Sequence, residues 1–348
     1  MRPAVNLPEV AGVITADEIA ATAATIAVLQ QPNGMIPWYP GGHCDPWNHV
    51  ETAMALSVAG HIEEAERAYG WLAATQRVDG SWHNYYRGDQ VEEAKLDTNV
   101  CAYVAAGAWH HWLVTGDLAF AEAYFTIVER ALDWVLDLQT PRGEIIWARH
   151  VDGTPWSYAL LTGSSSICHS VRCGVALAEL VGQSRPDWEL AAVNLADVIR
   201  HQPQAFEPKH RWAMDWYYPV LAGVVTGPSA SARLAGRWDE FVMSGLGVRC
   251  VNNEPWVTAA ETSECALAHL AAGDAASATE LLSWTRAHRQ ADGSYVTGIV
   301  YPQRITFPDG ERSAYTAAAV ILVADALSGA SSASGLFLGD HLPAVVDD

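Results

Sequence analysis

Two acidic residues, Asp45 and Glu261, stand near the beginnings of two alanine-rich segments that lie far apart in the sequence. A carboxyl group on an apolar helix is costly unless it faces a polar cavity, so we expect Glu261 to face one. Two carboxyl groups across a cleft can hydrolyse a glycosidic bond, because one protonates the leaving oxygen while the other activates water or attacks the sugar. We therefore predict that this pair is catalytic. Helix capping is the alternative for Asp45, and Asp97, Asp215 and Glu254 are further candidates for catalysis.

Aromatic, amide and charged side chains recur near the starts of the segments that we expect to be helical. Pyranose rings offer C–H faces to aromatic rings and hydroxyls to carboxylates and amides, and the chain has 15 tryptophans. We predict that the following residues bind a sugar: Trp38, Tyr39, His43, Trp47, Asn48, His49, Asp97, Asn99, Trp156, Tyr158, Arg172, Asp215, Trp216, Tyr217, Glu254, Trp256 and Tyr315. Tryptophans inside predicted helices are expected to pack the fold instead: Trp71, Trp109, Trp112, Trp134 and Trp284.

A metal site is the competing interpretation of one cluster. His43, Cys44, Asp45 and His49 lie close together in the sequence, and zinc accepts such ligands. However, the chain has no CxxC, HxH or HExxH pattern, and one short loop cannot readily supply four ligands. The GxSxG, Walker A and GxGxxG patterns are absent as well. We therefore expect no metal and no cofactor.

The elements that would position these residues come from a repeat. Residues 50–60 and 263–273 can be laid over each other, and each segment is followed, 19 residues after its final glycine, by Asp-Gly-Ser and an aromatic residue at 79–82 and 292–295. Each unit is typical of a helical hairpin: an alanine-rich helix ending at a glycine, an amphipathic helix, and a turn. Glu51 and Glu264 align in this repeat, and we interpret them as a structural pair.

Weaker copies fill the rest of the chain. Residues 97–116 and 118–139, 164–182 and 188–201, and 215–223 and 231–243 are predicted to pair, and 313–329 returns to the opening helix at 17–30. Strand signals are limited to 144–147 and 294–301. Repeats of two helices form an open solenoid or a closed ring. We favour an all-α (α/α)6 toroid, with one domain at 1–330 and a tail at 331–348 that either stays loose or covers the ring.

Two resemblances bear on function. The pattern at 76–82, Gln-x-x-Asp-Gly-Ser-Trp, resembles the repeat motif of terpene cyclases and related prenyltransferases, but the DxDD and DDxxD motifs of those enzymes are absent. The segment 41–51, Gly-Gly-His-Cys-Asp-Pro-Trp-Asn-His-Val-Glu, resembles more narrowly the mycobacterial methylmannose polysaccharide hydrolases, which are α-1,4-endomannosidases in a group often labelled prenyltransferase. Asn-Glu-Pro-Trp at 253–256 and Glu261 extend this resemblance over nearly the whole chain.

The second resemblance implies an (α/α)6 glycoside hydrolase that acts inside an intracellular mannose polymer. The chain order of many such hydrolases implies that Asp45 is the general acid and Glu261 the general base, with the reverse assignment left open. Carboxyl groups about 6.5–9.5 Å apart would make the mechanism inverting. The alternatives are a sugar epimerase or isomerase with a base from His43, His49 or His169, an isoprenoid cyclase or prenyltransferase-like protein, and a non-catalytic glycan-binding module.

Composition restricts the partners and the location. The formal net charge is −20, with 40 acidic residues against 20 basic ones. Such a surface repels phosphate backbones and anionic lipids, so we expect an oligo- or polysaccharide substrate and neither nucleic acid nor membrane. The first 20 residues lack a secretory signal, and the six cysteines show no pairing pattern. We therefore expect a cytoplasmic protein and leave its oligomeric state open.

Overall fold

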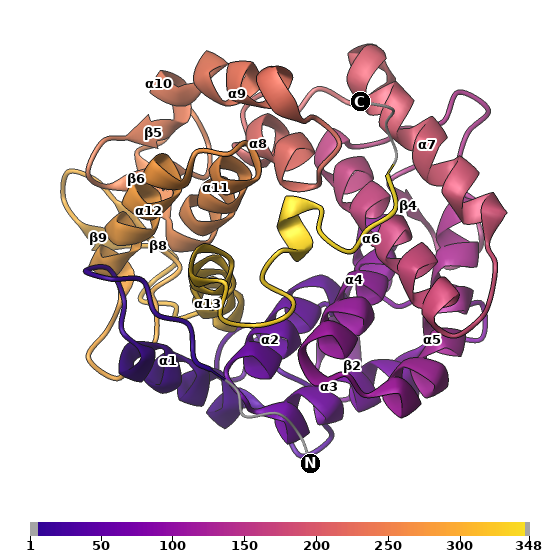
Figure 1. The fold of residues 1–348 in the computed structure, drawn as a ribbon, viewed down its shortest axis with the longest axis horizontal. Coiled ribbons are helices and arrows are strands. Elements are labelled where there is room, and N and C mark those ends of the chain that lie inside the picture. The colour runs from indigo at the N-terminus through magenta and orange to yellow at the C-terminus, as the bar shows by residue number, and fades with distance from the viewer. Residues whose placement is uncertain (1–5, 345–348) are drawn as a thin grey trace.

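In the computed structural model, which describes residues 6–344, the chain forms a ring that is mainly helical (Figure 1). The inner helices each pack on the next, and the last returns to the first. They are α2 (Pro46–Val58), α4 (Thr98–Thr115), α6 (Leu161–Leu180), α8 (Met214–Leu221), α11 (Ala259–Ala271) and α13 (Ala314–Ser328). The outer helices are α1 (Ala16–Leu29), α3 (Ile62–Thr75), α5 (Leu118–Leu136), α7 (Pro186–His201), α9 (Gly227–Gly236), α10 (Trp238–Phe241) and α12 (Ala275–Trp284).

The two sets of helices differ in burial, as their sequences predict. Every residue of α4 from Thr98 to His111 is buried, because this helix has neighbours on all sides. The outer helix α3 buries one face, with Ala65, Ala68 and Leu72 at helical spacing, and exposes the other. An apolar stripe of this kind directs an outer helix onto the layer beneath it. The inner helices are therefore buried more completely than the outer ones, and the expectation of a mainly helical fold is confirmed.

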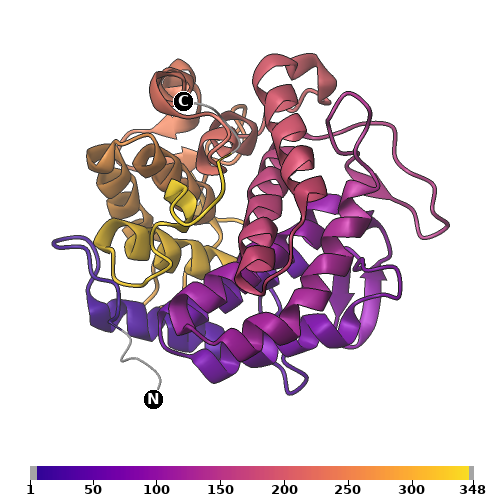
Figure 2. The same ribbon diagram turned by 45° about the vertical axis from the view of Figure 1, so that its right-hand side comes forward.

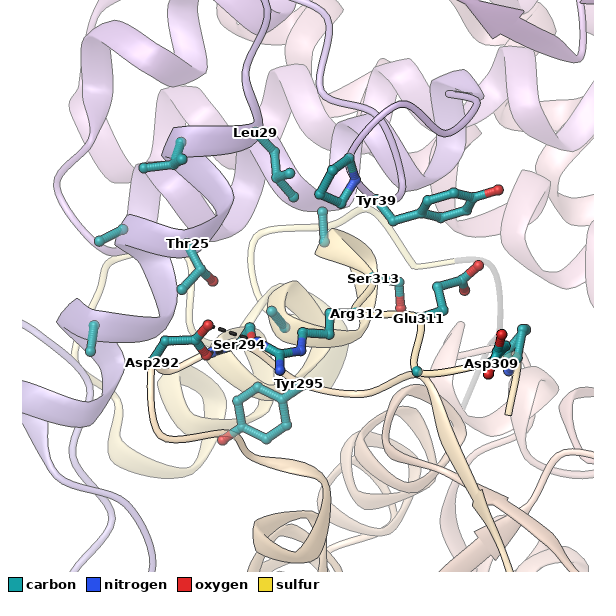
Figure 3. A pocket seen from close by; sticks show the side chains of 18 residues that line it. Thr25, Leu29, Tyr39, Asp292, Ser294, Tyr295, Asp309, Glu311, Arg312 and Ser313 are labelled. Carbon is teal, nitrogen blue, oxygen red and sulfur yellow. Dashed lines mark hydrogen bonds and ion pairs between the residues drawn. The ribbon is translucent and has the colours of Figure 1, made fainter. Parts of the chain in front are cut away.

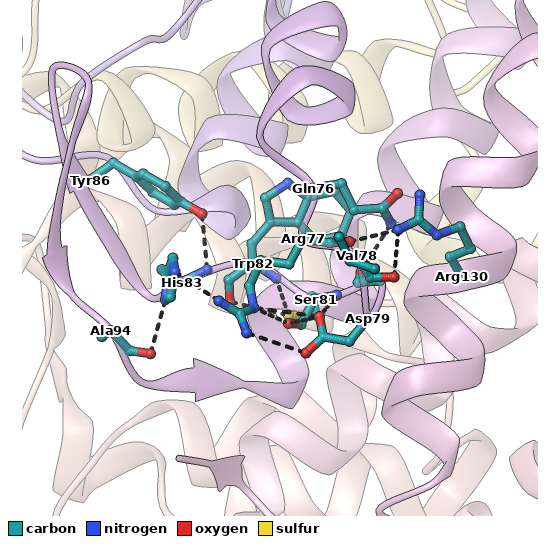
Figure 4. A network of polar contacts seen from close by, with 12 residues as sticks. Gln76, Arg77, Val78, Asp79, Ser81, Trp82, His83, Tyr86, Ala94 and Arg130 are labelled. Atoms are coloured by element: carbon teal, nitrogen blue, oxygen red, sulfur yellow. Dashed lines mark hydrogen bonds and ion pairs between the residues drawn. The ribbon is translucent and has the colours of Figure 1, made fainter. Parts of the chain in front are cut away.

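Three outer helices are each followed by a turn that bonds to the next outer helix, and Figure 4 shows the turn that follows α3. The side-chain Nε2 of Gln76 donates to the carbonyl of Gly80 at 3.0 Å and to that of Ile127, on α5, at 2.9 Å. Gln30 and Gln139 make the same pair of bonds after α1 and α5. Gly80 has φ +97°, and a Cβ there would collide with the backbone oxygen of Arg130. The motif at 76–82 is thus a structural device.

Short strands are more numerous than the sequence predicts. Two pairs, β1 (Tyr85–Arg87) with β2 (Gln90–Glu93) and β3 (Leu96–Asp97) with β4 (Ala148–Arg149), precede inner helices. A further antiparallel sheet contains β5 (Val242–Met243), β6 (Gly247–Arg249), β7 (Trp256–Thr258), β8 (Gly298–Val300) and β9 (Ile305–Thr306). The expected strand at 144–147 begins only at Ala148, and the one at 294–301 is reduced to β8. Strands of two to four residues carry no periodic signal, because distant partners create them.

The C-terminal segment covers the ring at the ends of the inner helices. In Figures 1 and 2 this segment, in yellow, crosses the ring and carries the short 3₁₀ helix η3 (Leu336–Leu338). Phe337 is buried and stacks on His169 with 5.2 Å between ring centroids, and the Nε of Arg172 donates to the carbonyl of Pro343 at 2.9 Å. The part of the expected tail at 331–344 therefore covers the ring, and residues 345–348 lie outside the described residues. The remaining 3₁₀ helices are η1 (Pro203–Ala205) and η2 (Thr285–His288).

Within residues 6–344, no helix has both the length and the apolar character needed to cross a lipid bilayer.

Candidate active site

The starts of the inner helices gather the acidic residues at one end of the ring, which we call the mouth. Asp45 and Asp97 cap α2 and α4, and Asp215 and Glu261 lie in the first turns of α8 and α11. Bonds between neighbouring starts show that they meet. Thr162, at the start of α6, donates to Oδ1 of Asp215 at 2.7 Å. The first amide of α13 donates at 2.7 Å to the carbonyl of Trp38, which precedes α2.

A cavity of ≈350 Å³ opens between the starts of α2, α4, α6 and α8. Its lining combines aromatic rings, carboxylates, an amide and a lysine. Among the lining residues are Trp47, Asp97, Asn99, Trp147, Thr162, Lys209, Trp212 and Asp215. This cavity therefore brings together four predicted sugar-binding residues from three repeats. The mixture suits a sugar, which needs apolar and polar contacts at once.

Asp45 is buried, with 3% exposure, and three donors hold its carboxyl group. Oδ1 accepts from the backbone N–H of Asn48 at 3.0 Å, and Oδ2 accepts from Asn48 Nδ2 at 2.7 Å and from the indole Nε1 of Trp38 at 2.6 Å. Burial raises the pKa of Asp45, and the three hydrogen bonds oppose part of that rise. Helix capping, the alternative for this residue, is present, but it uses only one of the two oxygens.

Glu261 is half-buried in the first turn of α11 and accepts a hydrogen bond from the hydroxyl of Thr258. Its charge contributes to raising the pKa of Tyr315, after the larger effect of burial. The ring of Tyr315 meets that of Trp38 edge-on, with 4.8 Å between centroids. Because Trp38 bonds Asp45, the two aromatic rings connect the surroundings of the two predicted catalytic acids.

Further aromatic rings line the mouth. His43 lies 4.4 Å, between ring centroids, from both Trp38 and Tyr85. On the other side of the mouth Trp147 meets Trp156 at 4.7 Å and Tyr158 at 5.4 Å. These contacts place His43, Trp156 and Tyr158, which were predicted to bind a sugar, among the aromatic rings of the mouth.

Several residues at the mouth were not predicted from the sequence: Tyr85, Lys95, Trp147, Lys209 and Trp212. The ammonium of Lys95 lies 4.3 Å from the centroid of Trp147 and 3.8 Å from Oδ2 of Asp97. Lys209 lines the cavity and lies 5.8 Å from the ring of Tyr158. These are the only two lysines in the sequence, and that rarity was the signal that could have drawn attention to them.

A second layer of acidic residues lies below the mouth. Glu51 and Glu264 are each the sixth residue of their helix, α2 and α11, so the repeat alignment that paired them is matched by their positions. Tyr103 donates to Glu51 at 3.3 Å, and Tyr217 donates to Glu264. Burial raises the pKa of Glu51 to about 8, and burial together with the charge of Glu51 raises that of Glu264 well above its usual range. Tyr217 therefore reaches this layer rather than the mouth.

The structure places three predicted sugar-binding residues outside the mouth. His49 is buried, its Nδ1 accepts from the amide of Ile36, and its Nε2 donates to the carbonyl of Ala68 on α3. Trp216 points outward, donates to the carbonyl of Arg233 and stacks on Phe241. Arg172 lies farther along α6 and holds the C-terminal segment. The angular positions of His49 and Trp216 on their helices direct these side chains away from the mouth, whereas Arg172 is too far along α6 to reach it.

Three further predicted residues lie at the edge of the mouth or beyond it. Glu254 is exposed in the loop before β7, and the indole of Trp256 donates to the carbonyl of Phe307 at 3.1 Å. Tyr39 lines a different cavity, described below. Among residues 6–344, no three His, Cys, Asp or Glu side chains are placed to hold a metal ion together.

Comparison with known proteins identifies a relative that is similar to the chain over nearly its whole length. No family model matches the chain. It is 50% identical over 337 residues to the MMP endo-(1,4)-3-O-methyl-alpha-D-mannosidase of Mycolicibacterium hassiacum, and the match covers 97% of this chain and 93% of that protein.

Solved structures share the fold at low sequence identity. A glycosidase variant in complex with glucose has a TM-score of 0.70 and 14% identity, covering 90% of this chain and 97% of its own. The GH63 mannosylglycerate hydrolase of Thermus thermophilus in complex with Tris has a TM-score of 0.67 and a sequence identity of 13%, and the match covers 87% of this chain and 99% of that one. A D-mannose isomerase has a TM-score of 0.68 and a sequence identity of 12%, and the match covers 88% of this chain and 96% of that one. The similarity to the relative at 50% identity shows that the chain is a glycoside hydrolase and belongs to the MMP endo-(1,4)-3-O-methyl-α-D-mannosidase family.

Proposed function

We propose that this enzyme cleaves internal α-1,4 bonds of a mannose polysaccharide that carries 3-O-methyl groups, and that it inverts the configuration at the anomeric carbon. The observation that carries the proposal is the mouth of the ring, where two carboxyl groups from distant repeats adjoin connected aromatic rings. The M. hassiacum relative is named for this linkage and this sugar, and its similarity extends over nearly the whole chain.

Asp45 is the general acid in this mechanism, and Glu261 is the general base. The raised pKa of Asp45 helps it to carry a proton near the leaving oxygen, as a general acid must. Glu261 takes a proton from water while the water oxygen bonds to the anomeric carbon. As the bond from that carbon to the bridging oxygen breaks, Asp45 gives its proton to the departing oxygen. One water is consumed, and two shorter chains result.

Asp97, Asn99 and Asp215 bind sugar hydroxyls, and Trp47, Trp147 and Trp212 offer their faces to the rings. The exposed indole of Trp212 and the partnerless, buried Oδ1 of Asn99 support this role. Asp97 and Asp215 already hold backbone amides or a neighbouring hydroxyl, so their geometry is set before a sugar arrives. Such preorganisation lowers the cost of binding.

We also propose that the ring is an (α/α)6 toroid formed by residues 1–330 as one domain. The pairing of each inner helix with an outer one supports it: α2 with α3, α4 with α5, α6 with α7, α8 with α9, α11 with α12, and α13 with α1. We further propose that the enzyme works in the cytoplasm. Its six cysteines are buried and free, as is usual for proteins of reducing compartments.

An epimerase or isomerase would need a histidine base at the mouth. His49 bonds backbone groups through both ring nitrogens, and His169 stacks on Phe337 of the C-terminal segment. Burial lowers the pKa of His49 to about 4 and that of His169 to about 3. The geometry therefore removes two of the three candidate bases of an isomerase, and His43 is the one that lies at the mouth.

The test is to incubate the enzyme with 3-O-methylated α-1,4-mannooligosaccharides and to follow the products by mass and by proton NMR. We expect internal cleavage, product masses that together exceed the substrate by one water, and a β-anomer as the first product. Products of unchanged total mass would contradict hydrolysis, and an initial α-anomer would contradict inversion.

Variants test the two acids. Asp45→Asn keeps a good N-cap residue at this position. We expect Asp45→Asn and Glu261→Gln, each as a single variant, to lower kcat by about 10²–10⁴-fold, which is the usual contribution of general acid–base catalysis. Asp117→Asn is the matched control, because Asp117 caps the outer helix α5. Undiminished turnover in either of the first two variants would remove that residue from the mechanism.

A further inference from the structure

A second, larger cavity lies beside the mouth, between α1 and the loop that leads from β9 into α13 (Figure 3). Its volume is ≈820 Å³. Figure 3 shows Thr25 and Leu29 of α1 on one side and the segment with Glu311 and Arg312 on the other. Neither Asp45 nor Glu261 lines this cavity, and neither of them lines the mouth cavity.

The α1 side of this cavity is mostly apolar. Ala21, Ala24 and Val28 succeed one another at helical spacing along α1, and Val28 is 85% exposed at the rim. Pro40 and Pro308 extend the apolar surface. An exposed apolar surface that is hollowed and bounded by polar groups is a common feature of a ligand site.

The polar groups on the opposite side already have partners. The guanidinium of Arg312 lies 2.8 Å from Oδ2 of Asp292, and Oε1 of Glu311 accepts from the hydroxyl of Thr297 at 2.9 Å. A ligand that fits this cavity therefore offers apolar groups to the α1 side and a few polar groups to the rim.

Residues that line this cavity directly adjoin residues of the mouth along the chain. Tyr39, which lines it, directly follows Trp38, which bonds Asp45. Ser313 and Ala314, which also line it, directly precede Tyr315, whose ring meets that of Trp38. The mouth cavity lies toward α4, α6 and α8, whereas this one lies toward α13 and α1. An enzyme that cuts inside a polymer must bind sugar units on both sides of the cut.

We infer that this cavity is a subsite for methylated sugar units next to the cleavage site, and that its α1 side receives their methoxyl groups. The inference rests on the proposed function and names the part of the enzyme that distinguishes a methylated chain from an unmethylated one. A methyl ether buries its methyl group against Ala24 and Val28 favourably. A free hydroxyl at the same place loses its hydrogen bonds to water and finds no partner.

The test compares two oligosaccharides of equal length, α-1,4-mannan with and without 3-O-methyl groups. Ala24→Gln and Val28→Gln place an amide on the apolar surface, and glutamine is well tolerated in helices. We expect each variant to reduce the ratio of kcat/KM for the methylated chain to that for the unmethylated chain by roughly fourfold for each methyl group displaced. Val193→Gln, an exposed valine on the outer helix α7, is the matched control and leaves the ratio unchanged.

The outcomes separate the two proposals. If the natural enzyme cleaves neither oligosaccharide, the proposed function fails. If it cleaves the methylated chain and the two α1 variants keep the natural ratio, the subsite is overturned while the proposed function stands. A shift in sedimentation velocity of the α1 variants would instead assign this surface to a second copy of the chain and would overturn the subsite as well.

Discussion

The indole Nε1 of Trp38 donates a hydrogen bond of 2.6 Å to Oδ2 of Asp45. The same ring contacts Tyr315 at the start of α13, so one tryptophan connects the first and last inner helices at the mouth. A donor to a carboxylate stabilises the charged form and lowers its pKa. Trp38 therefore acts on the acid–base chemistry of Asp45 without needing to contact the bond that breaks.

Trp38→Phe removes that donor while keeping an aromatic ring. We expect the pKa of Asp45 to rise and kcat/KM to fall by about 10–150-fold, because a hydrogen bond to a charged group is worth about 1.5–3 kcal/mol. If Asp45 is the general acid, the alkaline limb of the pH profile of kcat moves to higher pH. Movement of the acidic limb would assign Asp45 as the base, and Trp284→Phe on the outer helix α12 should move neither limb.

Stability should depend on pH through Glu51. Its pKa is about 8 in the folded protein against 4.5 for a free glutamate, so between these values the folded state binds more protons than the unfolded state. Stability from this group is therefore complete below about pH 4.5 and is lost as the pH rises toward 8. We expect Glu51→Gln to raise the free energy of unfolding at pH 8 by on the order of 1–3 kcal/mol relative to the natural protein.

The measurement for Glu51 is urea unfolding between pH 5 and pH 8, where the natural protein should weaken and Glu51→Gln should weaken less. Glu63 is exposed on α3, and Glu63→Gln should behave like the natural protein. Identical pH dependence in Glu51→Gln and the natural protein would show that Glu51 titrates normally in the fold.

The C-terminal cover should contribute to stability through Phe337. This side chain is 7% exposed against the inner helices, whereas Leu338 beside it is 38% exposed. We expect Phe337→Ala to cost about 3–5 kcal/mol of unfolding free energy, as is usual for a buried phenylalanine. Leu338→Ala should cost less than about 1 kcal/mol, and equal losses in the two variants would contradict the burial of this segment.

The glutamine turns should stabilise the ring without affecting chemistry. Gln76→Ala leaves the carbonyls of Gly80 and Ile127 without their side-chain donor, and we expect a loss of about 1–3 kcal/mol in thermal or urea unfolding with kcat retained. Gln290 is the matched control, because its Nε2 bonds only the carbonyl of His288, within its own turn. A loss in Gln290→Ala as large as that in Gln76→Ala would show that bonding between outer helices is not the cause.

Local patterns in the sequence predicted most of the helices, although the helix expected at 231–243 is divided into α9 and α10 and is followed by β5. Helical periodicity and the glycines after α2 and α11 act over a few residues, and a repeat shows which elements share a position in the fold. The same patterns predicted that Asp45, Asp97, Asp215 and Glu261 would lie at helix starts, where the structure has them.

Tertiary structure decided what each of those positions faces. A residue number places a side chain on a helix but does not say how that helix is rotated in the ring, so His49 and Trp216 were expected at the mouth and lie elsewhere. Arg172 was also expected there, but it lies farther along α6 and bonds the C-terminal segment. Lys95 and Trp147 reach the mouth through short strands whose partners are distant in the sequence. Helix formation depends on neighbours along the chain, whereas a binding site depends on neighbours in space, and only the closed ring supplies those.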